Sequence, residues 1–427
     1  MLTRRHVIHA GAAAAALAAP SLLLAAPQPL IGLSLPKTGI QAEIANELLL
    51  GYELAIKASG SVLGLKVLDD QSKEDLTAKN FTELAGDPSV VAGSGIVGTP
   101  HAIAAVPVAI AKGLPVVGLR SGADALRTGK PGVYHLRASF DQEIAKLVAL
   151  VKGSALSAIV AICSNDAFGK GVAKQLQAQM VAQGVRLLEV IPAERDGSDM
   201  AAATSKAAQL VKTNNGMAVG VFLILITKPM DQAAMLLRDT HSLVMPLFAM
   251  SFTATKSIVT SPKKHLVGLG LVTAFPLPSG SDSLAIQYRT AVDKFGTQDM
   301  LLSLTSLEGF FYGSVIAAAA VGGAATREGI QRKLIAGLIL PLFYIPQIQK
   351  LRRDHSGLAA YSLRKAIAQL ALRGVGMVYI VVVNQDPFIV LVIAADVLGR
   401  SIELAVAITA LRQQRQRVRH SIETVQM

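Results

Sequence analysis

Short apolar segments alternate with amphipathic segments of helical length between residue 30 and about residue 337 of this 427-residue chain. Strands are expected at 30–35, 64–68, 90–92 and 115–119, and in a second series at 157–162, 186–191, 217–226 and 247–249. The helices expected between them cover 41–59, 75–84, 101–112, 142–152, 169–183, 200–213 and 230–240. Such alternation is typical of βαβ units and parallel sheets. The sequence therefore predicts an α/β fold of two doubly wound parallel-sheet lobes, with a cleft where the strand ends of both lobes meet.

Residues 1–26 have the composition of an export signal. Arg4 and Arg5 precede a stretch rich in Ala and Leu, and none of these residues is acidic. A short basic region followed by an apolar region of this length is typical of a secretory signal peptide, and the Arg pair loosely fits a twin-arginine signal. We therefore expect residues 1–26 to direct the chain out of the cytoplasm. The export route and the cleavage site stay open, as does the alternative of an ordinary N-terminal helix.

The last ninety residues differ in character from the rest of the chain. Charged residues make up 16% of the sequence, and the mean hydropathy of +0.47 is high for a soluble protein. Three apolar stretches occur near the C-terminus, at 335–348, 358–383 and 388–411, with basic segments at 350–355 and 412–420. Three membrane crossings from an exported domain would place both basic segments in the cytoplasm, as the positive-inside rule expects. We expect a helical membrane segment at 338–427; the alternative is a buried helical subdomain.

The net charge of +12 does not indicate a nucleic-acid partner. A nucleic-acid-binding face needs basic residues interleaved with aromatic ones, whereas aromatic residues make up 4% of this sequence and Trp is absent. Enzyme motifs are missing too: the sequence contains no H-E-x-x-H, G-x-S-x-G or Walker A motif and no Cys/His cluster with metal-ligand spacing. Cys163, the single cysteine, follows an apolar run and is interpreted as a buried thiol at a strand end. We expect no catalytic activity, no cofactor and no metal.

Residues 93–98 spell G-x-G-x-x-G after the segment 90–92. A dinucleotide site would place this motif after the first strand and an acidic residue about 20 positions later, where this chain has Leu119 and Arg120. We interpret the motif instead as a loop that leads to a helix, with Thr99 at the N-cap and Pro100 at the first helical position. The free N–H groups at such a helix end suit a ligand carboxylate. Capping alone would explain Thr99 equally well, so both interpretations stay open.

Several short patches, each weak alone, form a specific set because of their order along the chain. They are Leu33-Ser34-Leu35-Pro36-Lys37-Thr38-Gly39, Val62-Leu63-Gly64, Asp69-Asp70-Gln71, Tyr134-His135-Leu136-Arg137, Asn165-Asp166-Ala167-Phe168-Gly169, Phe275-Pro276-Leu277-Pro278, Ser306-Leu307-Glu308-Gly309-Phe310 and Thr326-Arg327-Glu328. Over residues 30–337 the chain resembles the type I periplasmic solute-binding proteins of the branched-chain amino acid (Leu/Ile/Val-binding) ABC transporter family.

This resemblance implies an extracytoplasmic protein whose lobes close on an amino acid or a similar small polar ligand. The ligand would then pass to the permease and ATPase subunits of an ABC importer. The residues that the resemblance places at the ligand are Thr99, Ser121, Gly122, Phe168, Thr227 and Ser251. Family members usually add an aromatic and an acidic side chain near residues 227–229, where this chain has Thr-Lys-Pro. The identity of the ligand therefore stays open.

A second resemblance concerns the C-terminal segment. Residues 341–348, Pro-Leu-Phe-Tyr-Ile-Pro-Gln-Ile, together with 356–363, resemble one PQ-loop repeat of small sugar-transporter-like membrane proteins. The expected organisation is a signal peptide at 1–26, a two-lobed periplasmic domain with an incomplete second lobe at 27–337, and a segment at 338–427 that anchors the protein in the inner membrane. One alternative is a PQ-loop-type transporter or sensor fused to a ligand-binding domain; a less favoured one is an enzyme on the same scaffold. A natural fusion and a chimeric gene both stay open, as does the oligomeric state.

Overall fold

A computed structural model describes residues 27–154, 156–260, 263–297, 302–322 and 325–335. The expected signal peptide at 1–26 and the expected membrane segment at 338–427 lie outside these residues. Within the described ranges, none of the helices has both the length and the apolar character needed to cross a membrane.

The first lobe is built on a five-stranded parallel sheet with the strand order β2-β1-β3-β4-β5. Its strands are β1 (Leu30–Leu35), β2 (Gly64–Asp69), β3 (Val90–Ser94), β4 (Val116–Val117) and β5 (Val133–Tyr134). The helices α2 (Ala42–Ser59), α3 (Glu74–Gly86) and α4 (Thr99–Ala111) connect the first four strands. Strand β3 is buried along its whole length, as expected for a central strand with helices on both faces.

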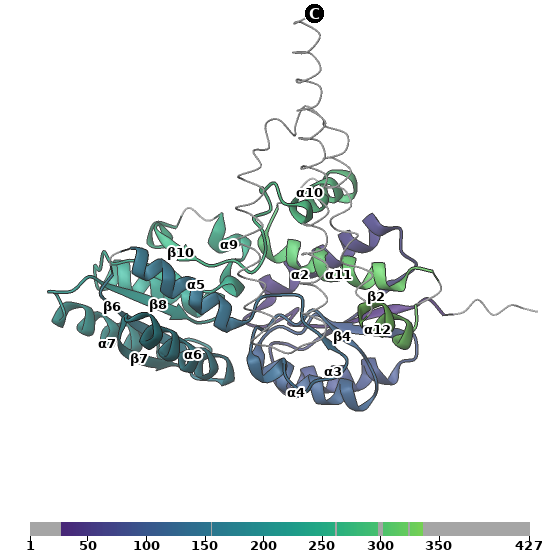
Figure 1. The fold of residues 1–427 in the computed structure, drawn as a ribbon, viewed down its shortest axis with the longest axis horizontal. Coiled ribbons are helices and arrows are strands. Elements are labelled where there is room, and N and C mark those ends of the chain that lie inside the picture. The colour runs from purple at the N-terminus through teal and green to yellow at the C-terminus, as the bar shows by residue number, and fades with distance from the viewer. Residues whose placement is uncertain (1–26, 155, 261–262, 298–301, 323–324, 336–427) are drawn as a thin grey trace, which may run out of the picture.

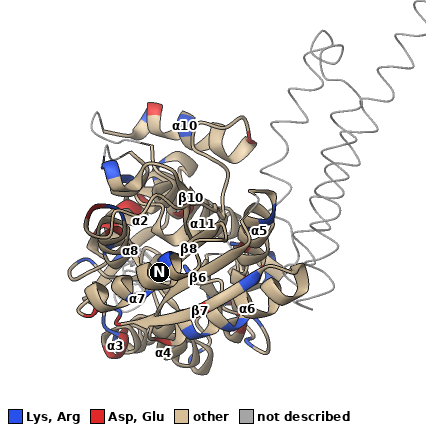
Figure 2. Cartoon of the chain, turned by 90° about the vertical axis from the view of Figure 1, so that its left-hand side faces the viewer, with Lys and Arg blue, Asp and Glu red and all other residues tan. Residues whose placement is uncertain are grey.

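The second lobe repeats this plan with a parallel sheet in the order β10-β9-β8-β6-β7. Its strands are β6 (Ala158–Ser164), β7 (Arg186–Ala193), β8 (Val219–Ile224), β9 (Leu247–Ala249) and β10 (Leu269–Leu271). The helices are α5 (Phe140–Gly153), α6 (Ala167–Gln183), α7 (Met200–Thr213) and α8 (Thr227–Met235), the last continued by a π-helical turn at Leu236–Thr240. Strands β6 and β8 are buried throughout and carry no charged residue, so they are tan in Figure 2.

The chain then returns to the first lobe. After the short helix α9 (Lys256–Val259) come α10 (Ser283–Phe295), α11 (Leu304–Ala320) and α12 (Arg327–Ile335). Figure 1 shows the two lobes side by side, with the green helices α11 and α12 beside the purple and blue elements of the first lobe. Helices α2 and α11 approach closely because glycines face each other: a Cβ on Gly51 would lie 2.1 Å from Ser306 O, and one on Gly309 would lie 2.3 Å from Leu48 O.

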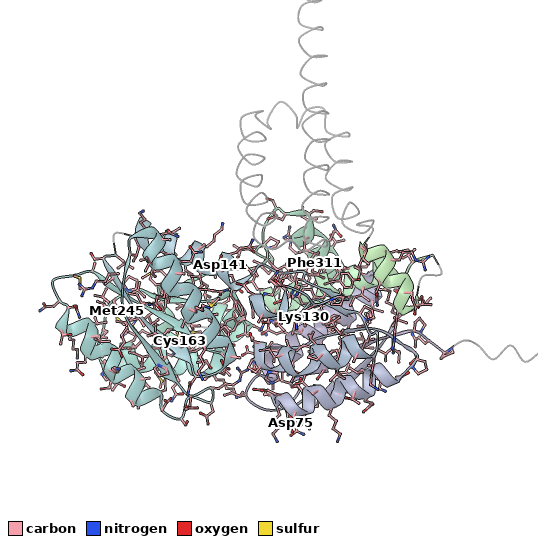
Figure 3. The ribbon with its side chains drawn as sticks, turned by 60° about the horizontal axis from the view of Figure 1, so that its bottom comes forward. Asp75, Lys130, Asp141, Cys163, Met245 and Phe311 are labelled. Atoms are coloured by element: carbon pink, nitrogen blue, oxygen red, sulfur yellow. The ribbon has the colours of Figure 1, made fainter. Side chains whose placement is uncertain are left out.

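These two parallel sheets confirm the predicted α/β fold, and Cys163 is buried near the end of β6 as predicted (Figure 3). The expected strand at 115–119 is shorter, because Gly118 has a φ of +74° and packs against the ring of Tyr312. The helix expected at 169–183 begins earlier, at Ala167, because the Asp166 side chain accepts a hydrogen bond from the N–H of Gly169 and caps it.

Candidate ligand-binding pocket

A narrow pocket lies between the lobes, with about 300 Å³ of empty space when the adjoining open solvent is included. The first lobe lines it with Gln41, Val97, Gly98, Thr99 and Arg120, and the second lobe lines it with Phe140, Phe168, Arg195, Ile226 and Phe252. Most of these residues follow the carboxyl ends of parallel strands, which is where open α/β sheets bind their ligands.

A larger hollow, with about 720 Å³ of empty space when open solvent is included, lies elsewhere between the lobes, where residues 254–260 face residues 277–279 and 302–304. Its lining includes the exposed side chains of Val259, Leu277 and Leu302. It is not formed by the carboxyl ends of the strands, so it lacks the feature that marks ligand sites in α/β sheets.

Thr99 is the first residue of α4, and Gly98 is the N-cap residue. The prediction that Thr99 caps the helix is therefore wrong. Gly98 has a φ of +105° and a ψ of 152°, a conformation that essentially only glycine adopts. The Thr99 hydroxyl lies 2.9 Å from the Ser121 hydroxyl, and both side chains are buried. Capping thus does not explain Thr99, and its hydroxyl is held at the wall of the pocket.

Arg195 reaches across the pocket from the second lobe. Its Nη2 donates to Gln41 Oε1 of the first lobe at 2.9 Å, and its Nη1 forms an ion pair with Asp166. Asp166 is fixed in turn by the N–H of Gly169, which donates to Asp166 Oδ1 at 3.0 Å. The guanidinium therefore has a defined position at the edge of the pocket, tied to both lobes.

Three phenylalanine rings form one wall. The ring centroids of Phe168 and Phe252 are 4.5 Å apart and nearly perpendicular, and Phe140 lies 5.3 Å from Phe168 and 6.2 Å from Phe252. Edge-to-face packing of this kind stabilises aromatic clusters beyond the burial of their area. The wall that the second lobe contributes is thus mostly apolar.

A buried network of charges lies next to the pocket. Arg120 donates from Nε to Glu308 Oε2 at 3.0 Å and from Nη1 to the carbonyl of Phe252 at 3.1 Å, which joins the two lobes. Arg137 pairs with Glu308 at 3.2 Å and with Glu143 at 3.3 Å. All four charged side chains are at most 4% exposed.

The environment sets the protonation of this network. Burial opposes the charge of Glu308, but Arg137 and Arg120 outweigh burial and hold the pKa of this carboxyl below its usual value. Burial raises the pKa of Glu143 despite its pairing with Arg137. Glu308 therefore stays ionised between two guanidiniums, and the network connects residues of both lobes.

The residues expected at the ligand occupy different positions. Thr99 and Phe168 line the pocket, and Ser121 lies one hydrogen bond behind Thr99. Gly122 packs against the start of α5, where a Cβ would lie 2.7 Å from the backbone nitrogen of Phe140.

Thr227 and Ser251 are set back from the pocket. Thr227 is buried beside the lining residue Ile226, and its hydroxyl has no hydrogen-bond partner among the described residues. Ser251 belongs to the charge network: its hydroxyl accepts from Arg137, and its N–H donates to Glu143 Oε2 at 3.1 Å.

Sequence analysis assigned no function to several lining residues, among them Gln41, Phe140 and Arg195. Arg195 comes two residues after β7, so its place after a strand end was a signal that could have marked it. Arg137 and Glu308 both fall within the quoted sequence patches, but the patches gave no reason to pair them.

Comparison with known proteins places this geometry in a wider context. A family model described as "Periplasmic binding protein" matches residues 30–367. A search of the curated proteins found no match. Solved structures with a similar fold include a substrate-binding periplasmic protein from Ralstonia solanacearum, which is 24% identical with a TM-score of 0.63, over 71% of this chain and 88% of that one.

Two further structures are similar. A possible leucine/isoleucine/valine-binding protein from Rhodopirellula baltica is 25% identical with a TM-score of 0.63, covering 71% of this chain and 85% of that one. A branched-chain amino acid transporter substrate-binding protein from Streptococcus pneumoniae was solved with isoleucine. It is 16% identical with a TM-score of 0.61, and the match covers 71% of this chain and 87% of that one. The TM-scores show that these proteins share the fold of this chain.

Proposed function

Since the chain belongs to the periplasmic binding protein family, we propose that it is the extracytoplasmic solute-binding component of an ABC importer. The observation that carries this proposal is the pocket between the lobes, to which each lobe contributes five lining residues. A ligand in this pocket would contact both lobes and would stabilise their association. The similar structures are substrate-binding proteins as well, which supports a binding role rather than catalysis.

Thr99 and Ser121 are proposed to hold the anionic end of the ligand. Their hydroxyls lie next to the N-terminus of α4, where no side chain caps the helix. Backbone N–H groups and the helix dipole favour negative charge at such an end. Phe168 would pack against the body of the ligand, while Gly122, Thr227 and Ser251 would shape the surroundings.

A thermal-shift screen of the full-length chain tests the function. The screen would cover amino acids, small carboxylates and sugars, with calorimetry on each solute that raises the melting temperature. The proposal predicts saturable binding of a small solute at one site per chain. A folded protein that binds no solute of any of these classes would contradict it.

For the terminal segments we propose, on sequence alone, a signal peptide at 1–26 and an inner-membrane segment at 338–427 with PQ-loop character. The family match overlaps this segment at residues 338–367, so part of it is shared with periplasmic binding proteins. An alkaline phosphatase fusion at the C-terminus should be inactive and one at Asn384 active. The reverse pattern, or release of the full-length protein by carbonate washing, would contradict a three-span segment. Loss of transport after deletion of 338–427, with binding intact, would instead favour the transporter alternative.

A further inference from the structure

The charges that line the pocket are all positive. Arg120 and Arg195 are among the lining residues, and none of the described lining residues is Asp or Glu. Burying a charged group without a partner of opposite sign is costly. Arg120 already pairs with Glu308 and Arg195 with Asp166, but each guanidinium keeps N–H groups that these contacts do not use. A ligand carboxylate can accept from those N–H groups, whereas the described lining residues offer a ligand ammonium group no carboxylate.

The nearest carboxylates are already engaged. Asp166 is paired with Arg195 and accepts from the N–H of Gly169. Glu308 accepts from Arg120, from Arg137 and from the hydroxyl of Tyr312 at 2.6 Å. An ammonium group that approached either carboxylate would therefore meet a guanidinium with the same charge.

His101 adds no charge beside the pocket. Burial, and after it the positive charge of Arg195, lower the pKa of His101 to about 4. The imidazole is therefore neutral at physiological pH. It lies beside the pocket, because a Cβ on Gly98 would be 3.2 Å from His101 Nδ1 and 3.3 Å from Arg195 Nη2.

The two walls of the pocket differ in polarity. The first lobe supplies the Thr99 hydroxyl, Gly98 at the start of α4 and the Arg120 guanidinium. The second lobe supplies Ile226 and three phenyl rings, with the Arg195 guanidinium at the edge of the pocket. A ligand that fits both walls has a negatively charged end toward the first lobe and an apolar body toward the second.

We propose that the pocket binds a small apolar monocarboxylate, aromatic or branched aliphatic, that has no ammonium group. This rests on the proposed solute-binding function and names the class of solute. Phenyl faces can also attract a quaternary ammonium ion. Here the three rings pack edge to face against one another, and the two guanidiniums would repel such an ion.

Matched ligand pairs test this directly by calorimetry on the full-length protein. L-Leucine is compared with 4-methylpentanoate, and L-phenylalanine with 3-phenylpropanoate, because the members of each pair differ only in the ammonium group. We expect the carboxylate of at least one pair to bind with a Kd roughly tenfold or more below that of its amino acid. Equal or tighter binding of the amino acids, or tighter binding of glycine betaine, would overturn the proposal.

Other outcomes separate the ligand class from the function itself. If only solutes of a different class bind, such as sugars, the class proposed here is wrong while the solute-binding function stands. If no solute binds to the folded protein, the solute-binding function itself fails.

Substitution of Arg195 provides a second test of the proposed ligand class. Arg195→Gln leaves the Asp166 carboxylate without its cation beside the pocket, so the preference for the carboxylate over the amino acid should fall about tenfold. Arg195→Lys keeps the charge and should keep the preference. An unchanged preference in a folded Arg195→Gln protein would contradict the role of charge, and the wild-type comparison still decides if this variant does not fold.

Discussion

The hydroxyl oxygens of Thr99 and Ser121 lie 2.9 Å apart, although 22 residues separate them along the chain. Thr99 starts α4 and Ser121 follows the end of β4, so the parallel sheet brings the two together at its carboxyl edge. Neither hydroxyl caps the helix. The pair therefore places a hydroxyl group at the wall of the pocket, opposite the apolar wall formed by the three phenylalanine rings.

Removing this pair should weaken binding of the ligand. A Thr99→Ala/Ser121→Ala double variant should lose about 1.5–3 kcal/mol of binding free energy, as expected for hydrogen bonds to a charged group. Calorimetry with the solute found in the screen measures the loss. Thr99→Ser keeps the hydroxyl and serves as the control. Wild-type affinity in the double variant would show that the pair does not contact the ligand.

The charge network should matter for stability. Glu308 accepts from both Arg120 and Arg137, so Glu308→Gln breaks two buried ion pairs at once. Loss of one partner of a buried pair costs about 3–5 kcal/mol, measured as the free energy of unfolding in urea. The control is Glu189→Gln in the exposed pair with Lys206, where about 0–1 kcal/mol is expected. Similar losses in both variants would contradict a structural role of the network.

Gly98 should not tolerate a side chain. Gly98→Ala would force a φ of +105° on alanine and place its Cβ 3.2 Å from His101 Nδ1. We expect a loss of stability of about 1–3 kcal/mol and weaker ligand binding, because the loop forms the pocket wall. Gly171→Ala lies in α6 with open space around its Cβ, and should be neutral or slightly stabilising. Calorimetry and urea denaturation of both variants would reveal whether the Gly98 conformation is needed.

Acidification should destabilise the protein through buried histidines. Burial, with the charge of Arg127, lowers the pKa of His135 to about 3, and the pKa of His101 is lowered to about 4. Below about pH 6.5 the unfolded chain binds protons at these positions and the folded chain does not, so stability falls as pH falls. The free energy of unfolding should therefore be lower at pH 5 than at pH 7. A His135→Gln variant should show a smaller loss between these values.

The titration of Asp70 has the opposite effect on the pH dependence of stability. Burial raises the pKa of Asp70 to about 6, so the folded state takes up a proton between about pH 6 and 4, where the unfolded state remains ionised. This proton uptake stabilises the folded protein on acidification. Asp70→Asn removes it, so the loss of stability between pH 7 and 5 should be steeper than in the wild type. A shallower loss would contradict the assigned direction of this shift.

The sequence was sufficient for the two-lobed α/β architecture, because most strands come from clear apolar segments that alternate with helical ones. The short edge strand β10 was not among the expected strands. The exact residues at which helices and strands begin and end were harder to predict. At Thr99 the residue types fit a capping interpretation, but the positive φ at Gly98 moved the helix start by one residue. Local preferences could not show that the Thr99 hydroxyl would meet Ser121 instead of the backbone.

Much of the pocket could not be predicted from the sequence because its contacts are distant along the chain. Arg195 meets Gln41 across 154 residues, and Arg137 meets Glu308 across 171. Each residue taken alone looks like an ordinary polar position. Only the meeting of the carboxyl ends of two separate sheets brings them together, and no periodicity in the sequence encodes that arrangement.

Binding of a small solute between the lobes is tested most directly by a crystal structure of the protein with a solute from the screen. The solute should lie with its charged end within hydrogen-bond distance of Thr99 and its apolar body against Phe168. A solute bound instead in the hollow next to Val259 and Leu277, or one that contacts a single lobe, would contradict a ligand site at the strand ends of both sheets.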